Sequence, residues 1–156
     1  MRMKKFIVFL TAAVAGIIAL SGCEEVKINE NRLPETARTF IRQNFPHTTI
    51  LSAEKEKEDG VKQYNVRLAD GTEIEFDAKG NWKSIECEFS VLPEAALLPT
   101  ISEYIAENYP GSKAYKIDKK YGGYEVEITA PSGSPQPGSD IELIFNAFGE
   151  FVRESR

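Results

Sequence analysis

The side chains that could do chemistry in this sequence are mainly carboxylates, and several of them alternate along one segment. Glu73, Glu75 and Asp77 are spaced two residues apart, so an extended strand would place all three on one face. Three more glutamates would extend this acidic surface: Glu125, Glu127 and Glu142. A straight strand separates such carboxylates by about 7 Å, whereas calcium needs about six to eight oxygens converging from a bent loop. We therefore predict a solvated face, or an acidic surface that steers a basic partner, rather than a metal site.

The other reactive groups do not form a recognisable catalytic set. His47 is the only histidine and follows Pro46, where a helix should end, so we expect it to be a loop residue. Cys87 is in step with Ile85 and Phe89, which predicts an inward strand position and a buried thiol. No serine or cysteine has a recognisable base beside it in the sequence. We predict that the protein is not an enzyme and binds no metal or cofactor.

The N-terminal segment has the pattern of an export signal that ends at a cysteine. Three basic residues precede an apolar run from Phe6 to Leu20, which is shorter than the roughly 20 residues needed to span a bilayer. The tetrapeptide Leu20-Ser21-Gly22-Cys23 resembles the bacterial lipobox, in which the cysteine is acylated and the preceding signal is removed. The resemblance implies that residues 1–22 are a signal peptide and that Cys23 carries a lipid. A plain secretory signal with an accidental cysteine is the alternative.

A lipid on Cys23 would make the membrane the first partner of the mature chain. Each buried methylene contributes about 0.8 kcal/mol, so several acyl chains would prevent release. Residues 23–32 are mostly polar and are expected to form a tether to the domain. Glu24 stands where some Gram-negative bacteria use aspartate to retain lipoproteins in the inner membrane. By that analogy we expect an outer-membrane lipoprotein that faces the periplasm or the cell surface.

Composition bounds the size and the partners of the domain. The chain has 156 residues, of which 42% are hydrophobic and 28% charged, as expected for one or two small globular domains. Its formal net charge is −5, and no cluster of lysine and arginine could replace the counterions of a phosphate backbone. Nucleic acid is therefore excluded as a partner. Two cysteines are also too few for a disulfide framework.

The chain repeats itself. Three pairs of segments match: 40–46 with 104–110, 64–68 with 124–128, and 73–82 with 142–151. We therefore predict two homologous repeats, 33–89 and 98–156, joined by a linker at 90–97.

Each repeat should begin with a helix of about ten residues. Leu33-Pro34 and Leu98-Pro99 supply a proline at the helix start, and Asn44-Phe45-Pro46 and Asn108-Tyr109-Pro110 end the two helices. Apolar residues then alternate with polar ones, and Asp70-Gly71 is a hairpin signal. Strands near 49–57 and 82–89 should complete the first repeat, and the corresponding strands of the second repeat should lie near 113–119, 123–130, 141–146 and 150–154.

These elements predict an α+β fold made of two tandem helix-plus-four-strand repeats. A single antiparallel sheet of about eight strands, with both helices on one face, would bury more apolar area than two separate copies. Trp82 should belong to the core rather than to a binding surface. Alternation, however, places it on the opposite face from Ile85, which requires a β-bulge or a turn that ends after Trp82.

The second repeat departs from the first at positions that could bind a partner. Ile144 and Phe148 correspond to Glu75 and Lys79, so two apolar side chains should stand on the solvent side. They form either a partner surface, to which Tyr115 and Tyr121 could belong, or single scattered exposures. The segment 131–140 replaces Asp70-Gly71. It could be a binding loop or a tolerated insertion, and we slightly favour the insertion.

The repeated pattern resembles a known family. Leu-Pro, Tyr-Ile, Asn-Tyr-Pro, Tyr-x-Val, Asp-Gly-x-Glu-Ile-Glu-Phe-Asp and Gly-x-Trp are similar to the PepSY-like family of β-lactamase-inhibitor-like envelope proteins. The resemblance extends from Leu33 to Phe151. It implies a fold related to the β-lactamase inhibitory protein, whose two repeats hold an enzyme on a concave sheet face. It implies no catalytic residue.

Two functions are consistent with these observations. The first is a non-catalytic, lipid-anchored envelope protein that binds a protein or peptide through the open sheet face, as an inhibitor would. Its candidate contact residues are Ile144, Phe148, Glu73, Glu75 and Tyr121. The alternative is a structural or assembly lipoprotein of the outer membrane.

Overall fold

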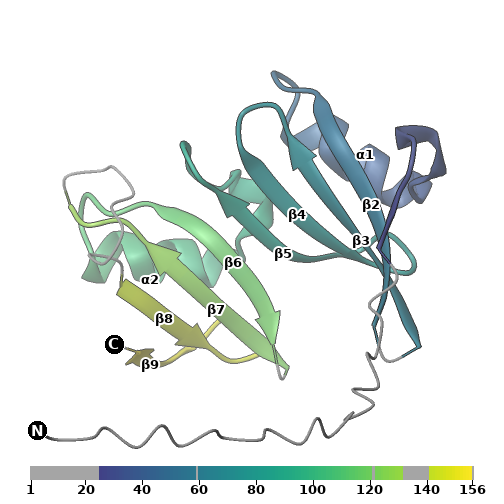
Figure 1. Ribbon diagram of the computed structural model, residues 1–156. Helices are drawn as coiled ribbons and strands as arrows, with labels where there is room; N and C mark the ends of the chain where they lie inside the picture. The colour runs from purple at the N-terminus through teal and green to yellow at the C-terminus, as the bar shows by residue number, and fades with distance from the viewer. Residues whose placement is uncertain (1–24, 59, 121, 132–140, 156) are drawn as a thin grey trace, which may run out of the picture.

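The computed structural model describes residues 25–58, 60–120, 122–131 and 141–155. Within them, one antiparallel sheet of nine strands follows the order of the chain from β1 to β9 (Figure 1). The expectations for the signal peptide, Cys23, Tyr121 and residues 132–140 lie outside the described residues. The observed fold is α+β, as predicted from the sequence.

Each repeat contributes one helix and four strands, and the N-terminal segment adds a further strand. The strands are β1 Val26–Lys27, β2 Ile50–Glu58, β3 Val61–Leu68, β4 Thr72–Asp77, β5 Trp82–Cys87, β6 Ala114–Lys120, β7 Gly123–Ile128, β8 Ile141–Phe145 and β9 Phe151–Ser155. The helices are α1 Glu35–Asn44 and α2 Pro99–Asn108, each preceded by a 3₁₀ turn, η1 Glu30–Arg32 and η2 Glu94–Ala96. The number of strands therefore exceeds the predicted eight.

The additional strand comes from the segment that we expected to be only a tether. Val26 and Lys27 pair with Lys55 and Glu54 of β2, and the backbone N–H of Ile28 donates to Ala53 at 2.9 Å. Val26 and Ile28 are the two apolar residues of this otherwise polar stretch. Ile28 packs against the core. Sequence reasoning underestimated this contribution because a two-residue strand has no periodicity.

The two helices end in the same way. The backbone N–H of Phe45 donates to Ile41, and that of Tyr109 donates to Ile105. In α1 the side-chain amide of Asn44 donates to the Phe40 carbonyl at 2.9 Å. In α2 the side-chain amide of Asn108 donates to the Tyr104 carbonyl at the same distance. Each asparagine side chain thus adds a second hydrogen bond to a carbonyl of the last helical turn. The Asn-aromatic-Pro signature predicted these ends correctly.

One row of paired residues forms the centre of the core. It crosses β2 to β8 and consists of Ala53, Val66, Ile74, Ile85, Ile117, Val126 and Leu143. Each of these side chains is at most 4% exposed. The helices pack on this apolar surface through equivalent edge-to-face contacts, Phe40 against Phe76 and Tyr104 against Phe145.

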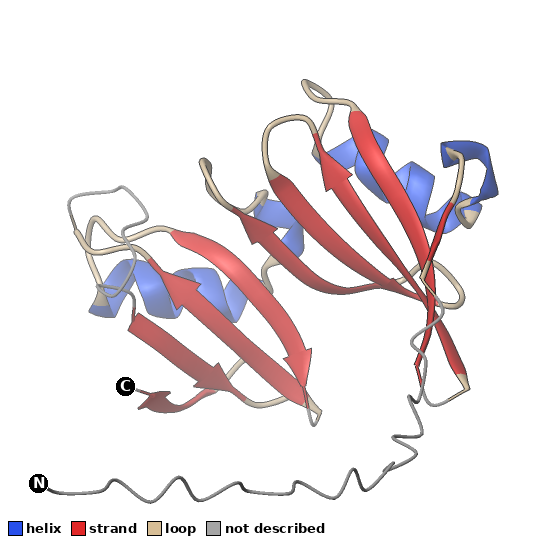
Figure 2. Cartoon of the chain, viewed as in Figure 1, coloured by secondary structure: helices blue, strands red, loops and turns tan. Residues whose placement is uncertain are grey.

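The two repeats join between β5 and β6. Ile85 pairs with Ile117, and the flanking pairs are Ser84 with Asp118 and Glu86 with Lys116. Both repeats contribute to a single cluster of buried residues. Figure 2 shows the two lobes, each with a helix against its strands, meeting where β5 and β6 lie side by side. The shared interior accounts for the continuity of the sheet, because each lobe alone would expose apolar surface at this boundary.

A β-bulge resolves the conflict at Trp82. The pairing passes from Glu75–Ser84 to Phe76–Trp82, so Lys83 is the extra residue. Trp82 thereby returns to the core side, half-buried against Phe40. The second repeat has the same bulge, since Ile144 pairs with Arg153 and Phe145 with Phe151.

The inward positions near the end of β5 were predicted only in part. Cys87 is fully buried, as expected, and burial raises the pKa of its thiol above the usual value. Phe89 is 75% exposed, so its predicted inward position is wrong. The strand ends at Cys87, and alternation no longer determines where later side chains point. His47 is exposed in the turn after α1, which confirms the loop prediction.

Candidate functional site

The face of the sheet opposite the core row is polar and carries two rows of paired residues. Directly paired residues on neighbouring strands share a face, and adjacent rows along a strand alternate between faces. The first row is Lys27, Glu54, Asn65, Glu75, Ser84, Asp118, Glu125, Ile144 and Arg153. The second row is Ser52, Arg67, Glu73, Glu86, Lys116, Glu127, Glu142 and Ser155. We call this surface the open face.

Carboxylates outnumber cationic side chains in both rows of the open face. Most of the carboxylates in the second repeat have a cation beside them. Lys116 Nζ lies 2.9 Å from Glu127 and 3.6 Å from Glu86, and Lys120 Nζ lies 2.5 Å from Glu125 and 3.8 Å from Asp118. The negative charge of this half is therefore largely compensated within the protein.

Partial burial, hydrogen bonds and neighbouring charges determine the pKa values of Lys116 and Glu127. Burial opposes ionisation of Glu127, but hydrogen bonds from Tyr115 and Lys116 outweigh it and lower the pKa of the Glu127 carboxyl. Burial likewise opposes the charged form of Lys116, while Glu127 and Glu86 raise the pKa of the ammonium group. Both groups consequently stay charged at neutral pH. Tyr115, which could have belonged to a partner surface, is instead buried, and its hydroxyl donates to Glu127 at 2.7 Å.

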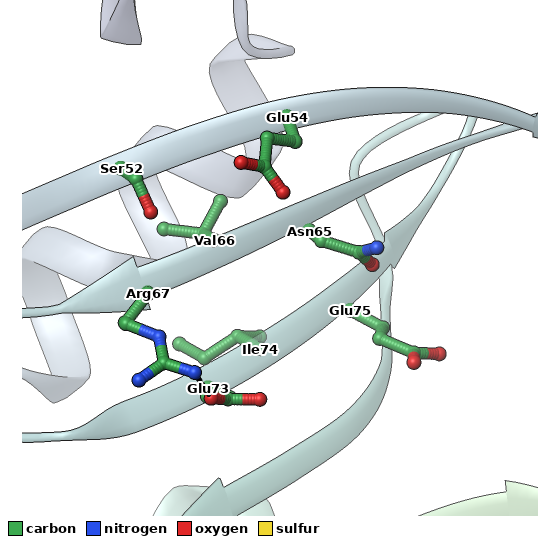
Figure 3. Close-up of a pocket in the computed structure, with 8 residues that line it drawn as sticks. All are labelled: Ser52, Glu54, Asn65, Val66, Arg67, Glu73, Ile74 and Glu75. Atoms are coloured by element: carbon green, nitrogen blue, oxygen red, sulfur yellow. Dashed lines mark hydrogen bonds and ion pairs between the residues drawn. The ribbon is translucent and has the colours of Figure 1, made fainter. Parts of the chain in front are cut away.

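The first repeat presents a shallow groove on its half of the open face. The groove has a volume of about 320 Å³ and is lined by Ser52, Glu54, Asn65, Val66, Arg67, Glu73, Ile74 and Glu75. Figure 3 shows that its polar side chains come from the three adjacent strands β2, β3 and β4. Arg67 forms an ion pair with Glu73 across β3 and β4. We call this feature the β2–β4 groove.

Among the described residues, the β2–β4 groove contains an unsatisfied acceptor and an unpaired carboxylate. The side-chain oxygen of Asn65 is buried and accepts no hydrogen bond. Glu75, its cross-strand neighbour, makes no ion pair with any described residue. A buried acceptor without a donor is uncommon, because the lost hydration is not replaced. The groove therefore combines an uncompensated carboxylate with an unsatisfied acceptor, both of which suit a hydrogen-bond donor that carries positive charge.

The structure brings some of the predicted contact residues together and separates others. Glu73 and Glu75 both line the β2–β4 groove. Ile144 lies in the same row as Glu75 but at the other end of the sheet, where it is half-buried. Phe148 is 78% exposed and lies in the turn after β8. Its backbone carbonyl accepts a hydrogen bond from the Thr100 hydroxyl of α2. Ile144 and Phe148 therefore do not form one patch, because the turn after β8 bends toward the helix.

Sequence reasoning missed Asn65, Glu54 and Arg67 as groove residues. Alternation within β3 does place Asn65 and Arg67 on the polar face. The signal that was lacking is the order of the strands, which sets Glu54 beside Asn65 and Asn65 beside Glu75.

No three histidine, cysteine, aspartate or glutamate side chains in the described part of the chain are arranged to hold a metal ion. No helix within the described ranges has the length and apolar character that crossing a bilayer requires.

Comparison with known families identifies the class of protein that this fold defines. The family described as "Putative beta-lactamase-inhibitor-like, PepSY-like" matches residues 19–61 and 62–153. The chain belongs to this PepSY-like family. The family was predicted from the repeated sequence pattern, and its two matched segments together cover most of the chain.

Several solved structures are similar to this chain. A "putative periplasmic protein" of the DUF2874 family from Bacteroides vulgatus is 32% identical, with a TM-score of 0.75 over 85% of this chain and 98% of that one. A second from the same species, of unknown function, is 34% identical, with a TM-score of 0.74 over 85% and 99%. A "putative calcium-regulated periplasmic protein" from Bacteroides thetaiotaomicron is 28% identical, with a TM-score of 0.74 over 85% and 97%. No curated protein matches.

Proposed function

We propose that this protein is a non-catalytic binding protein of the cell envelope, anchored through a lipid on Cys23. Its open face holds a basic segment of a protein or peptide, in the manner of an inhibitor. The envelope location is supported by the description of three similar proteins as periplasmic. An acylated Cys23 at the processed N-terminus, detected by mass spectrometry, would support the anchor, and an unmodified thiol would contradict it.

The arrangement of the helices supports the open face as the binding surface. Phe40 of α1 and Tyr104 of α2 contact Phe76 and Phe145, which belong to the same buried cluster. In our proposal both helices therefore cover one side of the sheet, and the other side stays available. A polar sheet face with an excess of carboxylates favours a partner of opposite charge.

The unpaired carboxylate of Glu75 is the observation that carries this proposal. Its charge is uncompensated by the described residues, whereas Glu73, Glu125 and Glu127 each have a cation within reach. A lysine or arginine side chain of the partner would pair with Glu75 and could also donate to the buried oxygen of Asn65. Such charge-assisted hydrogen bonds are stronger than neutral ones.

Reversing the charge of Glu75 should weaken partner binding strongly. We expect Glu75→Lys to lower the amount of partner captured from envelope extract by about tenfold or more, because an attractive charge becomes a repulsive one. Quantitative mass spectrometry of the captured proteins provides the measurement. Glu107→Lys is the matched control, since Glu107 is exposed on α2, away from the open face.

Capture that is unchanged by Glu75→Lys, or reduced equally by Glu107→Lys, would rule out the β2–β4 groove as the contact. If no protein is captured by either form, the structural or assembly role becomes the better account.

A further inference from the structure

A second cavity lies beside α2, remote from the open face. It is an open groove of about 520 Å³ between the segment that precedes α2, the helix itself and the loop that follows it. Its apolar walls are formed by Val91, Leu92, Leu97, Ile105, Ala106 and Pro110. Its volume falls within the range of small-molecule sites, roughly 300 to 1,000 Å³. We call it the α2 groove.

The α2 groove exists because the second repeat has small residues where the first has large ones. Ser102 and Ala106 of α2 correspond to Arg38 and Arg42 of α1, and Ala114 of β6 corresponds to Ile50 of β2. The equivalent ends of β2 and β6 have the same register, since Ile50 pairs with Leu68 and Ala114 with Ile128.

The first repeat has a longer side chain at one of these positions. Arg38 is half-buried, and its Nε is buried. Gly111 similarly replaces His47 in the loop after the helix.

A buried hydroxyl without a partner lies in the wall of the α2 groove. Ser112 is only 6% exposed, and its Oγ has no hydrogen-bond partner among the described residues. The corresponding Thr48 is satisfied, because its hydroxyl accepts from the backbone N–H of Asp70 at 3.2 Å. In the second repeat the Thr129 N–H donates to the Lys113 carbonyl, as the Ala69 N–H donates to Thr49, so Ala130 takes the place of Asp70. The Ser112 hydroxyl nevertheless receives no hydrogen bond there from a described residue.

We propose that the α2 groove binds a small, uncharged aliphatic molecule that carries one hydroxyl or amide head group. The aliphatic part would cover the apolar walls, and the head group would form the missing hydrogen bond with Ser112 after a rotation of its side chain. An uncharged head group is favoured because burying an unpaired charge costs much more than burying a hydrogen-bonded polar group. Glu94 and Lys113, which also line the groove, have opposite charges and select for neither sign.

This site is independent of partner binding by the open face, because the two surfaces share no lining residue. The two proposals can therefore fail separately. The test uses 1-hexanol as the probe and hexanoate as a charged analogue. Amide chemical shifts of the purified protein are recorded during titration.

Hexanol should produce saturable shifts at Ile105, Ala106 and Ser112, with a dissociation constant on the order of 1 mM, as expected for so small a ligand. Hexanoate should bind about tenfold more weakly. Ser102→Arg places a long side chain at a position that lines the groove, and it should lower hexanol affinity about tenfold or more. Ala95→Arg adds the same charge at an exposed position outside the groove and should leave affinity unchanged.

Ser112→Ala distinguishes the head-group contact from simple apolar filling. It should weaken hexanol binding roughly fivefold to tenfold while the protein stays folded, because one net hydrogen bond is lost. The proposal is overturned if Ser102→Arg leaves hexanol affinity intact, if the shifts map elsewhere, or if they do not saturate. It is also overturned if N-acetyl-leucine amide shifts these resonances and hexanol does not, since the groove would then accept a peptide side chain.

Discussion

Replacing Gly80 by alanine should lower the free energy of unfolding by about 3 kcal/mol or more. Gly80 lies in the turn between β4 and β5 with a φ of +86°, a conformation that residues with a side chain adopt only with strain. A Cβ atom at this position would lie 2.7 Å from the Cβ of Pro34 and 2.9 Å from the backbone nitrogen of Ala37. The start of α1 therefore cannot accommodate a methyl group without moving.

Gly60→Ala is the matched control for this prediction. Gly60 has a φ of +82°, yet a Cβ there would meet no atom within 4 Å. Gly60→Ala should therefore lower the free energy of unfolding only by the cost of the left-handed backbone conformation, about 1 to 2 kcal/mol. Urea denaturation of the two variants and the parent provides the comparison. Equal losses for Gly60→Ala and Gly80→Ala would mean that close packing of the turn against α1 contributes nothing.

Phe145→Ala should destabilise the first repeat although Phe145 belongs to the second. The side chain is 1% exposed, so its removal should cost about 3 to 5 kcal/mol and lower the melting temperature by roughly 10 °C or more. Trp82 is the only tryptophan and packs on Phe40 in the first repeat. Because the two repeats share one core, the Trp82 fluorescence transition should shift together with the circular dichroism transition.

The control for this experiment is Phe148→Ala, which removes an equal side chain that is 78% exposed. It should change the melting temperature by only a degree or two, as expected for surface substitutions. A Trp82 transition that stays in place while circular dichroism becomes biphasic in Phe145→Ala would show that the repeats unfold separately.

The fold could be predicted from the sequence largely because the two repeats can be aligned with each other. The same proline, asparagine and alternation signals occur in both repeats, so each helix and strand assignment was supported twice. The bulge at Lys83 was foreseen as one of two solutions, since Trp82 and Ile85 could not otherwise share the core. The strand at Val26–Lys27 was missed because its stability comes from pairing with β2, which the local pattern does not encode.

The candidate site was less accessible to prediction. Alternation identified Glu73 and Glu75 as surface residues but could not show that Asn65 and Glu54 lie beside them, because strand order is a long-range property. Ile144 and Phe148 were expected on one solvent-facing surface because their counterparts, Glu75 and Lys79, are polar. That correspondence could not show how closely the turn after β8 packs on α2, where a Cβ at Gly149 would lie 2.2 Å from the Thr100 hydroxyl.

Site-specific photocrosslinking in living cells tests the central claim most directly. A photoreactive phenylalanine analogue would replace Ser52, which lines the β2–β4 groove, so that Glu75 stays in place. In a second strain the analogue would replace Glu107 on α2. The account predicts a crosslinked adduct of higher mass from position 52 and none from position 107. An adduct from position 107 alone, or none from position 52 in cells that produce the folded protein, would contradict a partner on the open face.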